Sequence, residues 1–179
     1  METEDHALVT AYLSGERGAA EALIERYQRL VFNIARRMAG QQDAPDIAQN
    51  VFLKAFEHLA TFDARYPFRS WISRIAVNES LDHLAARRPN DSLDGDWPAP
   101  GPGAGEAMNG IDLSRTVERA LLRLQPDLRS VVVLRYFLDL SYREMGRLLD
   151  LPEKTVKSRL FTSRQLLKEL LAGQSALGG

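Results

Sequence analysis

The chain contains no cysteine and only three histidines, which are His6, His58 and His83. Disulfides and thiolate metal sites are therefore excluded, and histidines so far apart in the sequence do not suggest a metal cluster. The sequence also lacks an apolar run of the roughly 18 residues that a membrane-spanning helix needs. Residues 1–13 carry three acidic side chains and no basic one, unlike a signal peptide, so we expect a cytoplasmic protein.

Basic residues are missing from one internal stretch. Residues 91–110 hold four acidic and no basic side chains, whereas the net charge is −1 over residues 1–90 and +4 over residues 111–179. Residues 89–110 also contain four prolines and five glycines, so they cannot form a core and are predicted to be a flexible linker. The glycines of 101–105 do not form a phosphate-binding loop, because no strand precedes them and no loop lysine follows.

Residues 140–170 predict two helices joined by a tight turn. Ser141 and Glu144 have the spacing of a capping box, which starts a helix at Tyr142. Asp150 tolerates the left-handed conformation that often ends a helix, and Pro152 suits the first turn of the next one. Gly146 leaves room where another helix could cross closely.

The second of these helices has two distinct faces. Its inward residues are expected to be Val156, Leu160, Ser163 and Leu167. Lys154, Lys157, Ser158 and Phe161 lie on another face, which is basic. Two short helices with a basic second helix favour a helix-turn-helix that enters the DNA major groove. The alternative is an ordinary helical hairpin with a solvated basic face.

Two further amphipathic helices precede this pair, over residues 111–124 and from Pro126 onward. We expect them to complete a four-helix domain of about 60 residues, a size that folds alone only marginally. The residues expected in its core are Leu113, Val117, Ala120, Leu121, Leu124, Val131, Val132, Leu134, Tyr136 and Phe137.

The N-terminal half is also predicted to be helical. Residues 4–38 form two helices broken near 14–18, and Asp43 is placed to cap a third that runs to about Ala60. This third helix has an apolar face that must be buried, centred on Ile47, Val51, Ala55 and Leu59, and a second face of different character. The second face consists of Asp46, Gln49, Asn50 and Leu53. It is either a solvated face with one stray leucine or the docking surface of a protein partner.

Residues 61–74 concentrate aromatic side chains among arginines. Aromatic rings stack on unpaired bases while arginines contact phosphates, so this mixture is typical of single-strand binding. Phe62 and Phe68 are expected in the core instead, because Phe68 shares an apolar face of a helix that starts at Pro67. Tyr66 and Trp71 are the better candidates for base contact.

Three segments together resemble the extracytoplasmic-function (ECF, group IV) sigma factors of bacterial RNA polymerase, over about residues 7–170. DAPDIAQNVFLKAF, residues 43–56, is similar to the DxxDxxQxxFLxAW pattern of that family. Residues 62–88 resemble its FRxxxxFRxWLxRIAxNxxxDxxRR pattern. Residues 134–164, LRYFLDLSYREMGRLLDLPEKTVKSRLFTSR, are similar to its helix-turn-helix.

The resemblance implies three sets of functional residues. The set that docks on the clamp helices of the largest polymerase subunit is Asp46, Gln49, Asn50 and Leu53. The set that opens the -10 promoter element and holds its non-template strand is Tyr66, Arg69, Trp71, Arg74, Asn78 and Asp82. The set that reads the -35 element is Lys154, Thr155, Lys157, Ser158, Phe161 and Thr162.

Four residues depart from the family pattern. Val77 replaces a commonly basic residue, which should weaken a phosphate contact beside Asn78. Asn50 stands where an acidic residue is usual, and Thr162 where arginine is frequent. Asp150 replaces a common turn glycine, at the cost of some backbone strain.

The resemblance implies an all-α protein without cofactors or catalysis. Its expected parts are a region 2 domain at 1–88, a flexible acidic linker at 89–110, a region 4 helix-turn-helix domain at 111–171 and a disordered tail at 172–179. Its expected partners are core RNA polymerase, including its clamp helices and flap region, promoter DNA and an anti-sigma factor. We expect a monomer when free, active in a stress response, nucleoid-associated on polymerase and held at the inner membrane by its anti-sigma factor.

Two alternatives come from other classes of protein. An autonomous helix-turn-helix repressor would explain the C-terminal half, but such repressors generally require dimer symmetry and paired half-sites. An enzyme could use the carboxylates of Asp46, Glu57, Asp63 and Asp82. No nucleophile, metal cluster or phosphate loop in the sequence accompanies them, so catalysis has no support.

Overall fold

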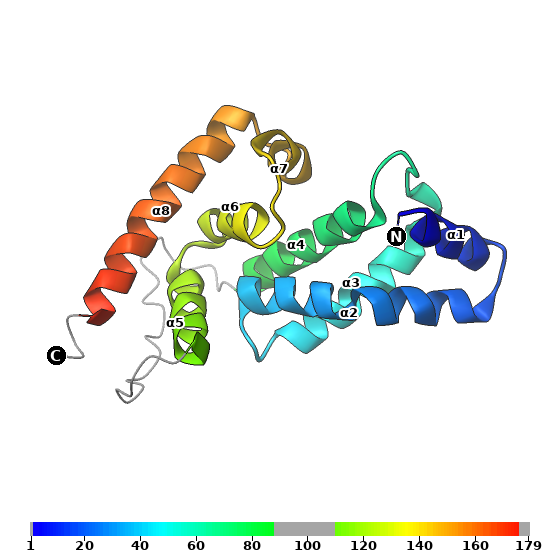
Figure 1. The fold of residues 1–179 in the computed structure, drawn as a ribbon, viewed down its shortest axis with the longest axis horizontal. Helices are drawn as coiled ribbons and strands as arrows, with labels where there is room; N and C mark the ends of the chain where they lie inside the picture. The colour runs from blue at the N-terminus through cyan, green and yellow to red at the C-terminus, as the bar shows by residue number, and fades with distance from the viewer. Residues whose placement is uncertain (1, 88–109, 176–179) are drawn as a thin grey trace. The chain divides into compact units, whose positions relative to one another are not determined.

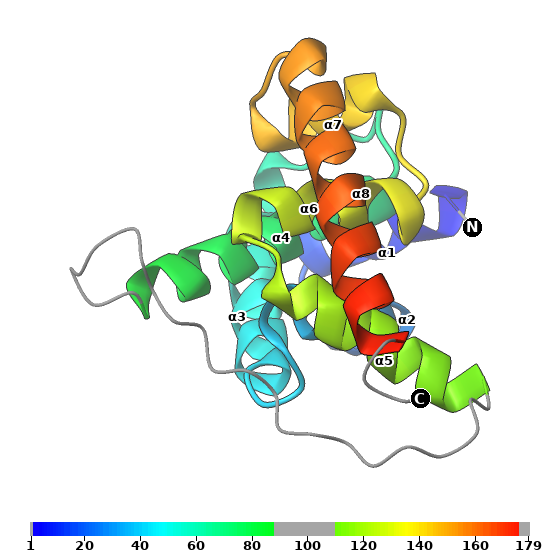
Figure 2. The same cartoon turned by 90° about the vertical axis from the view of Figure 1, so that its left-hand side faces the viewer.

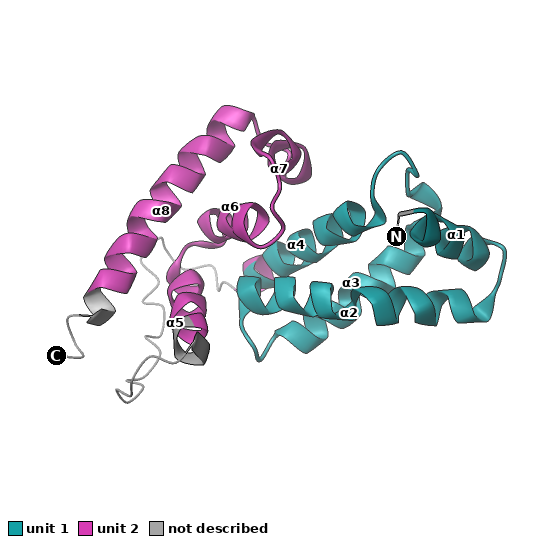
Figure 3. Cartoon of the chain, viewed as in Figure 1, with its two compact units in different colours: residues 1–84 teal, residues 85–179 magenta. Residues whose placement is uncertain are grey.

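The computed structural model describes residues 2–87 and 110–175 (Figure 1). All regular secondary structure in these two ranges is helical. The chain divides into two compact units, residues 1–84 (unit 1) and residues 85–179 (unit 2), which Figure 3 distinguishes by colour. The predicted all-α class with two small helical domains is therefore confirmed for the described residues. The predicted linker lies outside them, except for Gly110.

Unit 1 is built from four α-helices, the last of which extends two residues beyond it, and a short 3-10 helix. They are α1 (Glu2–Leu13), α2 (Arg17–Ala39), α3 (Ala44–Glu57), η1 (Leu59–Thr61) and α4 (Phe68–Ala86). Two glycines with positive φ, Gly15 at 92° and Gly40 at 96°, end α1 and α2, because glycine adopts this conformation without a steric penalty. The predicted break near residues 14–18 is confirmed.

The core of unit 1 forms where α2, α3 and α4 face one another. Leu23, Val31 and Met38 recur along one side of α2, and each is at most 1% exposed. The predicted inward residues of α3, which are Ile47, Val51, Ala55 and Leu59, are also buried. The predicted end of α3 near Ala60 was wrong: the α-helix ends at Glu57, and η1 continues the chain with a tighter turn.

Asp43 occupies the N-cap position of α3, as predicted, but its side chain makes no capping hydrogen bond. One carboxylate oxygen lies 3.6 Å from Nε2 of His83 on α4 instead. The start of α3 is therefore connected to α4 through a side chain that the sequence assigned to local capping.

Unit 2 contains α5 (Gly110–Arg123), α6 (Pro126–Tyr136), α7 (Tyr142–Leu149) and α8 (Glu153–Ser175). The long helix α8 packs against α5, α6 and α7, which Figure 2 shows from a second direction. The described helix extends to Ser175, so the predicted disordered tail begins too early at residue 172. Residues 176–179 and the side chain of Leu113 lie outside the description.

Helix α6 is the central helix of unit 2, and all residues from Arg129 to Leu134 are buried. Two core predictions beyond this segment were wrong, because Tyr136 is 56% exposed and Phe137 is 37% exposed. Successive residues of a helix are rotated by about 100°, which turns Tyr136 away from the side of Leu134. The helix also ends there, so the chain leaves the packed helices at Phe137.

The turn between α7 and α8 follows the local rules that the sequence indicated. Ser141 and Glu144 form the predicted capping box, and the hydrogen bonds lower the pKa of the Glu144 carboxyl. Asp150 has φ 54° and ψ 48°, the left-handed conformation expected of it. The prediction for Pro152 is shifted by one residue, because α8 begins at Glu153 and Pro152 directly precedes it.

Gly146 was predicted to admit a crossing helix, but the close neighbour is the turn itself. A Cβ atom added at this glycine would lie 2.6 Å from the carbonyl oxygen of Leu151. The amide of Leu151 donates a hydrogen bond to the carbonyl of Gly146 at 2.9 Å. Glycine is therefore required so that the turn can fold back onto α7.

Candidate functional site

The outer face of α3 carries the four residues predicted to dock on a partner, hereafter the docking face. Asp46, Gln49, Asn50 and Leu53 are all exposed, and Leu53 is 56% exposed. The apolar side of the same helix is buried in unit 1. The structure thus brings the predicted residues together on one accessible helix face, with a large apolar side chain among polar ones.

A charged pair connects the docking helix to α4. Lys54, which follows Leu53, forms an ion pair with Glu79, which follows Asn78. The hydrogen bond that Lys54 Nζ donates to the Glu79 carboxylate raises the pKa of the Lys54 amine. The Glu79 side chain is only 10% exposed, so this carboxylate depends on its partner for compensation of charge. The pair fixes α3 and α4 relative to each other.

The aromatic segment before and within α4 separates into buried and exposed rings. Phe68 is 1% exposed, in agreement with the core prediction, whereas Phe62 is only half-buried. The ring centroid of Trp71 lies 5.6 Å from that of Phe62 and 5.4 Å from that of Phe68. Trp71 is half-buried in this cluster, while Tyr66 is 51% exposed. Tyr66 is therefore the more accessible of the two predicted base-contacting rings.

The polar residues of α4 predicted to contact the -10 element lie on its solvent side. Arg69, Arg74, Asn78 and Asp82 are exposed, and the last three follow each other at intervals of four residues. With Tyr66 and Trp71, these residues are called the strand-opening set below. Val77 is fully buried, so its side chain faces the core. The weaker phosphate contact expected from the absence of a basic residue here stays a prediction.

Helix α8 presents the residues predicted to read the -35 element, hereafter the reading face. Thr155 is half-buried and the rest are exposed, namely Lys154, Lys157, Ser158, Phe161 and Thr162. Of the four predicted inward residues, Val156, Leu160 and Ser163 are at most 1% exposed and Leu167 is half-buried, so the two faces are confirmed over residues 154–163. Ser163 satisfies its hydroxyl by donating to the carbonyl oxygens of Leu128 and Arg159.

Two buried polar groups that support these faces were missed in the sequence. In unit 1, Asp5 is 3% exposed and accepts hydrogen bonds from the Tyr27 hydroxyl and from Arg26. Burial and the bond to Asp5 raise the pKa of the Tyr27 hydroxyl. In unit 2, Arg129 is 1% exposed. For both Asp5 and Arg129, the sequence signal was no more than a charged residue next to a run of apolar ones.

Arg129 holds the C-terminal end of α5. Its guanidinium donates to the carbonyl oxygens of Leu121 at 2.9 Å, Leu122 at 2.6 Å and Leu124 at 2.8 Å. The last carbonyls of a helix lack intrahelical partners, and a cation compensates the negative end of its dipole. Burial lowers the pKa of Arg129 to about 10, so the group remains charged at neutral pH.

Within residues 2–87 and 110–175, the histidines and acidic side chains do not form a group that could hold a metal ion. None of the helices in these two ranges is long and apolar enough to cross a membrane.

Comparison with known proteins finds two family models on this chain. Residues 23–89 match "Sigma-70 region 2", and residues 114–167 match "Sigma-70, region 4". The first match contains the docking face and the strand-opening set, and the second contains the reading face.

Curated proteins and solved structures show the same similarity. The chain is 30% identical to the ECF RNA polymerase sigma factor SigW of Bacillus subtilis, covering 88% of this chain and 91% of that protein. It is 33% identical to the ECF RNA polymerase sigma-E factor of Escherichia coli K12, covering 91% and 92%. A structure of CnrH in complex with the cytosolic domain of CnrY matches with a TM-score of 0.68 and 28% identity, covering 94% and 97%.

Proposed function

Because the chain belongs to the ECF sigma factors of RNA polymerase, we propose that it docks on core polymerase through α3 and recognises promoters through α4 and α8. In this proposal the docking face contacts the clamp helices of the largest subunit, and unit 2 also contacts the flap region. The strand-opening set captures the -10 element, and the reading face binds the -35 element. The proposal rests on the exposure of these residues within the two matched regions, since all but Trp71 and Thr155, which are half-buried, are exposed.

The protein supplies binding energy rather than chemistry. Pulling a base from the duplex costs a few kcal/mol, and stacking on an exposed ring such as Tyr66 offsets that cost. One well-placed base contact contributes about 1–3 kcal/mol, so neither unit alone would select a promoter from a genome. Two readers held on one polymerase combine their affinities through effective concentration.

We also propose a group IV sigma factor that works in a stress response and is controlled by an anti-sigma factor. CnrH, which this chain resembles, was solved in complex with a second protein, the cytosolic domain of CnrY, and we expect this chain to bind a protein partner too. The anti-sigma factor would cover the docking or reading face until a signal removes it. While bound to the anti-sigma factor, the protein would be held at the inner membrane. Once released, it would act in the cytoplasm, at the nucleoid together with polymerase.

The function is tested by mixing the purified chain with core polymerase. Co-elution of the two is expected, as is initiation at new positions on a library of randomised promoters, mapped by sequencing the transcripts. A chain that forms a stable dimer and binds palindromic DNA without polymerase would instead support an autonomous repressor. A chain that neither joins polymerase nor changes the start sites would refute the proposal.

Disruption of the docking face should weaken polymerase binding. Gln49→Ala removes a polar contact with the polymerase, and Leu53→Asp replaces an apolar contact by a charge. With both substitutions we expect the affinity for core polymerase to fall about tenfold or more. A pull-down with increasing core concentrations measures this. Gln28→Ala with Leu13→Asp is the matched control, because Gln28 is exposed and Leu13 is 54% exposed, much like Leu53. Equal retention of both variants would contradict the docking assignment.

Changes on the reading face should affect promoter choice and leave polymerase binding intact. Lys157→Ala with Ser158→Ala removes two outward side chains of α8, and we expect about tenfold less transcription from -35-dependent promoters. Lys168→Ala with Ser114→Ala changes exposed residues of the same types in unit 2 and serves as the control. Loss of core binding in the first variant would mean that the reading face has another role.

Tyr66 offers a cleaner test of strand opening than Trp71, because Trp71 also packs against Phe62 and Phe68. Tyr66→Ala should reduce the open-complex population about tenfold, since base stacking on the exposed ring is lost. Permanganate reactivity of unpaired thymines in the -10 element measures the opening. Tyr66→Phe keeps the ring and should restore most of the signal. Normal opening by Tyr66→Ala would exclude this ring from base capture.

A further inference from the structure

We propose that Tyr142 is a positioning residue that holds the side chain of Lys157 in the orientation used to contact promoter DNA. The inference rests on the proposed function, since it assigns a role within the reading face. Tyr142 is the first residue of α7 and contributes no side chain to the predicted reading face itself.

The ring of Tyr142 lies beside two cations from the neighbouring helices. The Lys157 Nζ atom of α8 is 5.4 Å from the ring centroid. The Arg135 Cζ atom of α6 is 5.8 Å from the same centroid. Both distances fall within the range of about 6 Å in which the negative face of an aromatic ring attracts a cation. One half-buried ring at the start of α7 thus lies beside a cation of α6 and a cation of α8.

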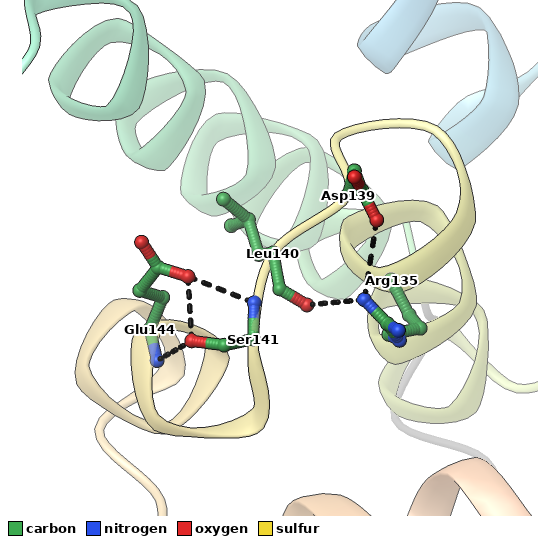
Figure 4. A network of polar contacts seen from close by, with 5 residues as sticks. All are labelled: Arg135, Asp139, Leu140, Ser141 and Glu144. Carbon is green, nitrogen blue, oxygen red and sulfur yellow. Dashed lines mark hydrogen bonds and ion pairs between the residues drawn. The ribbon is translucent and has the colours of Figure 1, made fainter.

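The backbone that carries this ring is fixed independently on both sides (Figure 4). Arg135 donates to the Leu140 carbonyl at 3.1 Å and to the Asp139 carboxylate at 3.3 Å. Ser141 and Glu144 close the capping box, with the Ser141 amide 2.8 Å from Glu144 Oε2. These contacts restrain the residues directly before Tyr142 and so limit where its ring can lie.

Lys157 remains accessible while it is held. Its side chain is 56% exposed, and its second partner, Glu153, lies at 3.9 Å, the outer limit of an ion pair. Lysine loses much rotamer entropy when it is immobilised in an interface. A lysine already ordered by the ring loses less of this entropy on binding. We therefore expect the ring to increase DNA affinity without contacting a base.

The contact can be tested on the wild-type protein without DNA. A lysine beside an aromatic ring has its side-chain methylene protons shifted upfield in the NMR spectrum. We expect such a shift for Lys157, its loss in Tyr142→Leu and its retention in Tyr142→Phe. Unshifted Lys157 methylene protons in the wild type would overturn the proposal, whatever the stability of the variants.

The consequence for DNA is tested with the holoenzyme, reconstituted with core polymerase. The probe is a promoter duplex that the wild-type holoenzyme selects from a pool with a randomised -35 region. Tyr142→Leu should bind it about three- to tenfold more weakly, and Tyr142→Phe should restore most of the affinity. Tyr136→Leu removes an exposed ring from the same unit and is the matched control.

A double-mutant cycle separates positioning from a general structural role. If the ring acts through Lys157, Tyr142→Leu should have little further effect on a Lys157→Ala background. Additive losses, or full affinity in Tyr142→Leu, would overturn the proposal. If the wild-type holoenzyme selects no -35 sequence, the proposed function fails instead, and the NMR result still shows whether the ring holds the lysine.

Discussion

Arg129→Met should lower the free energy of unfolding of unit 2 by about 3–5 kcal/mol. The substitution keeps much of the side-chain volume, but it leaves the carbonyl oxygens of Leu121, Leu122 and Leu124 without the donor that now reaches all three. A domain of roughly this size has a total stability of about 3–9 kcal/mol. The substitution therefore removes a large part of this stability, and we expect -35-dependent transcription to fall because more of unit 2 is unfolded.

Hydrogen exchange followed by mass spectrometry can measure this loss separately in each unit of the full chain. Amides of α6 and α8 should lose protection in Arg129→Met, while those of α2 and α3 keep it. Arg123→Met alters an exposed arginine at the end of α5 and should leave both units protected. In Arg129→Lys the charge is kept, but the lysine amine cannot reach all three carbonyl oxygens, so we expect an intermediate loss of hydrogen-exchange protection. Full protection of α6 in Arg129→Met would show that the three hydrogen bonds contribute little.

Gly146→Ala should destabilise unit 2 by about 2–3 kcal/mol, against the usual preference for alanine in a helix. The added Cβ would lie 2.6 Å from the carbonyl oxygen of Leu151, and this atom belongs to the backbone of the turn. The turn must therefore move, and α8 moves with it. We expect lower protection of α7 and α8 in hydrogen exchange and weaker transcription from -35-dependent promoters.

Gly18→Ala is the natural control for this substitution. Gly18 also lies within a helix, α2, and a Cβ atom there would meet nothing within 4 Å. Alanine should then stabilise unit 1 by up to about 1 kcal/mol, because it loses less backbone entropy than glycine on folding. The two variants are expected to have opposite signs. A stabilising Gly146→Ala would mean that the turn can relax at small cost.

The features predicted correctly depend mainly on residues close in sequence. The capping box of Ser141 and Glu144, the left-handed Asp150 and the two faces of α8 follow from spacing and backbone preference over a few positions. The exposure of Leu53 also followed from its place opposite the apolar side of α3. The family resemblance gave these faces their expected partners, which their geometry alone does not specify.

Predictions that were wrong, as for Tyr136 and Phe137, or incomplete, as for Val77 and Trp71, required knowledge of the neighbouring helices. Tyr136 and Phe137 are residue types common in protein cores. The buried part of α6 ends at Leu134, however, so both side chains are exposed to solvent. Val77 was considered for its chemistry, whereas packing turns its position into the core. Trp71, expected at a base, also has Phe62 and Phe68 as partners.

The sequence by itself determined the helices, most of their ends and which face of α3 and α8 meets solvent, because periodicity and capping act within a few turns. Only the tertiary structure decided that Arg129 completes α5, that Asp5 is buried beside Tyr27 and that the ring of Tyr142 meets Lys157. These contacts join residues from different helices. Their existence depends on how the helices pack, which no local pattern encodes.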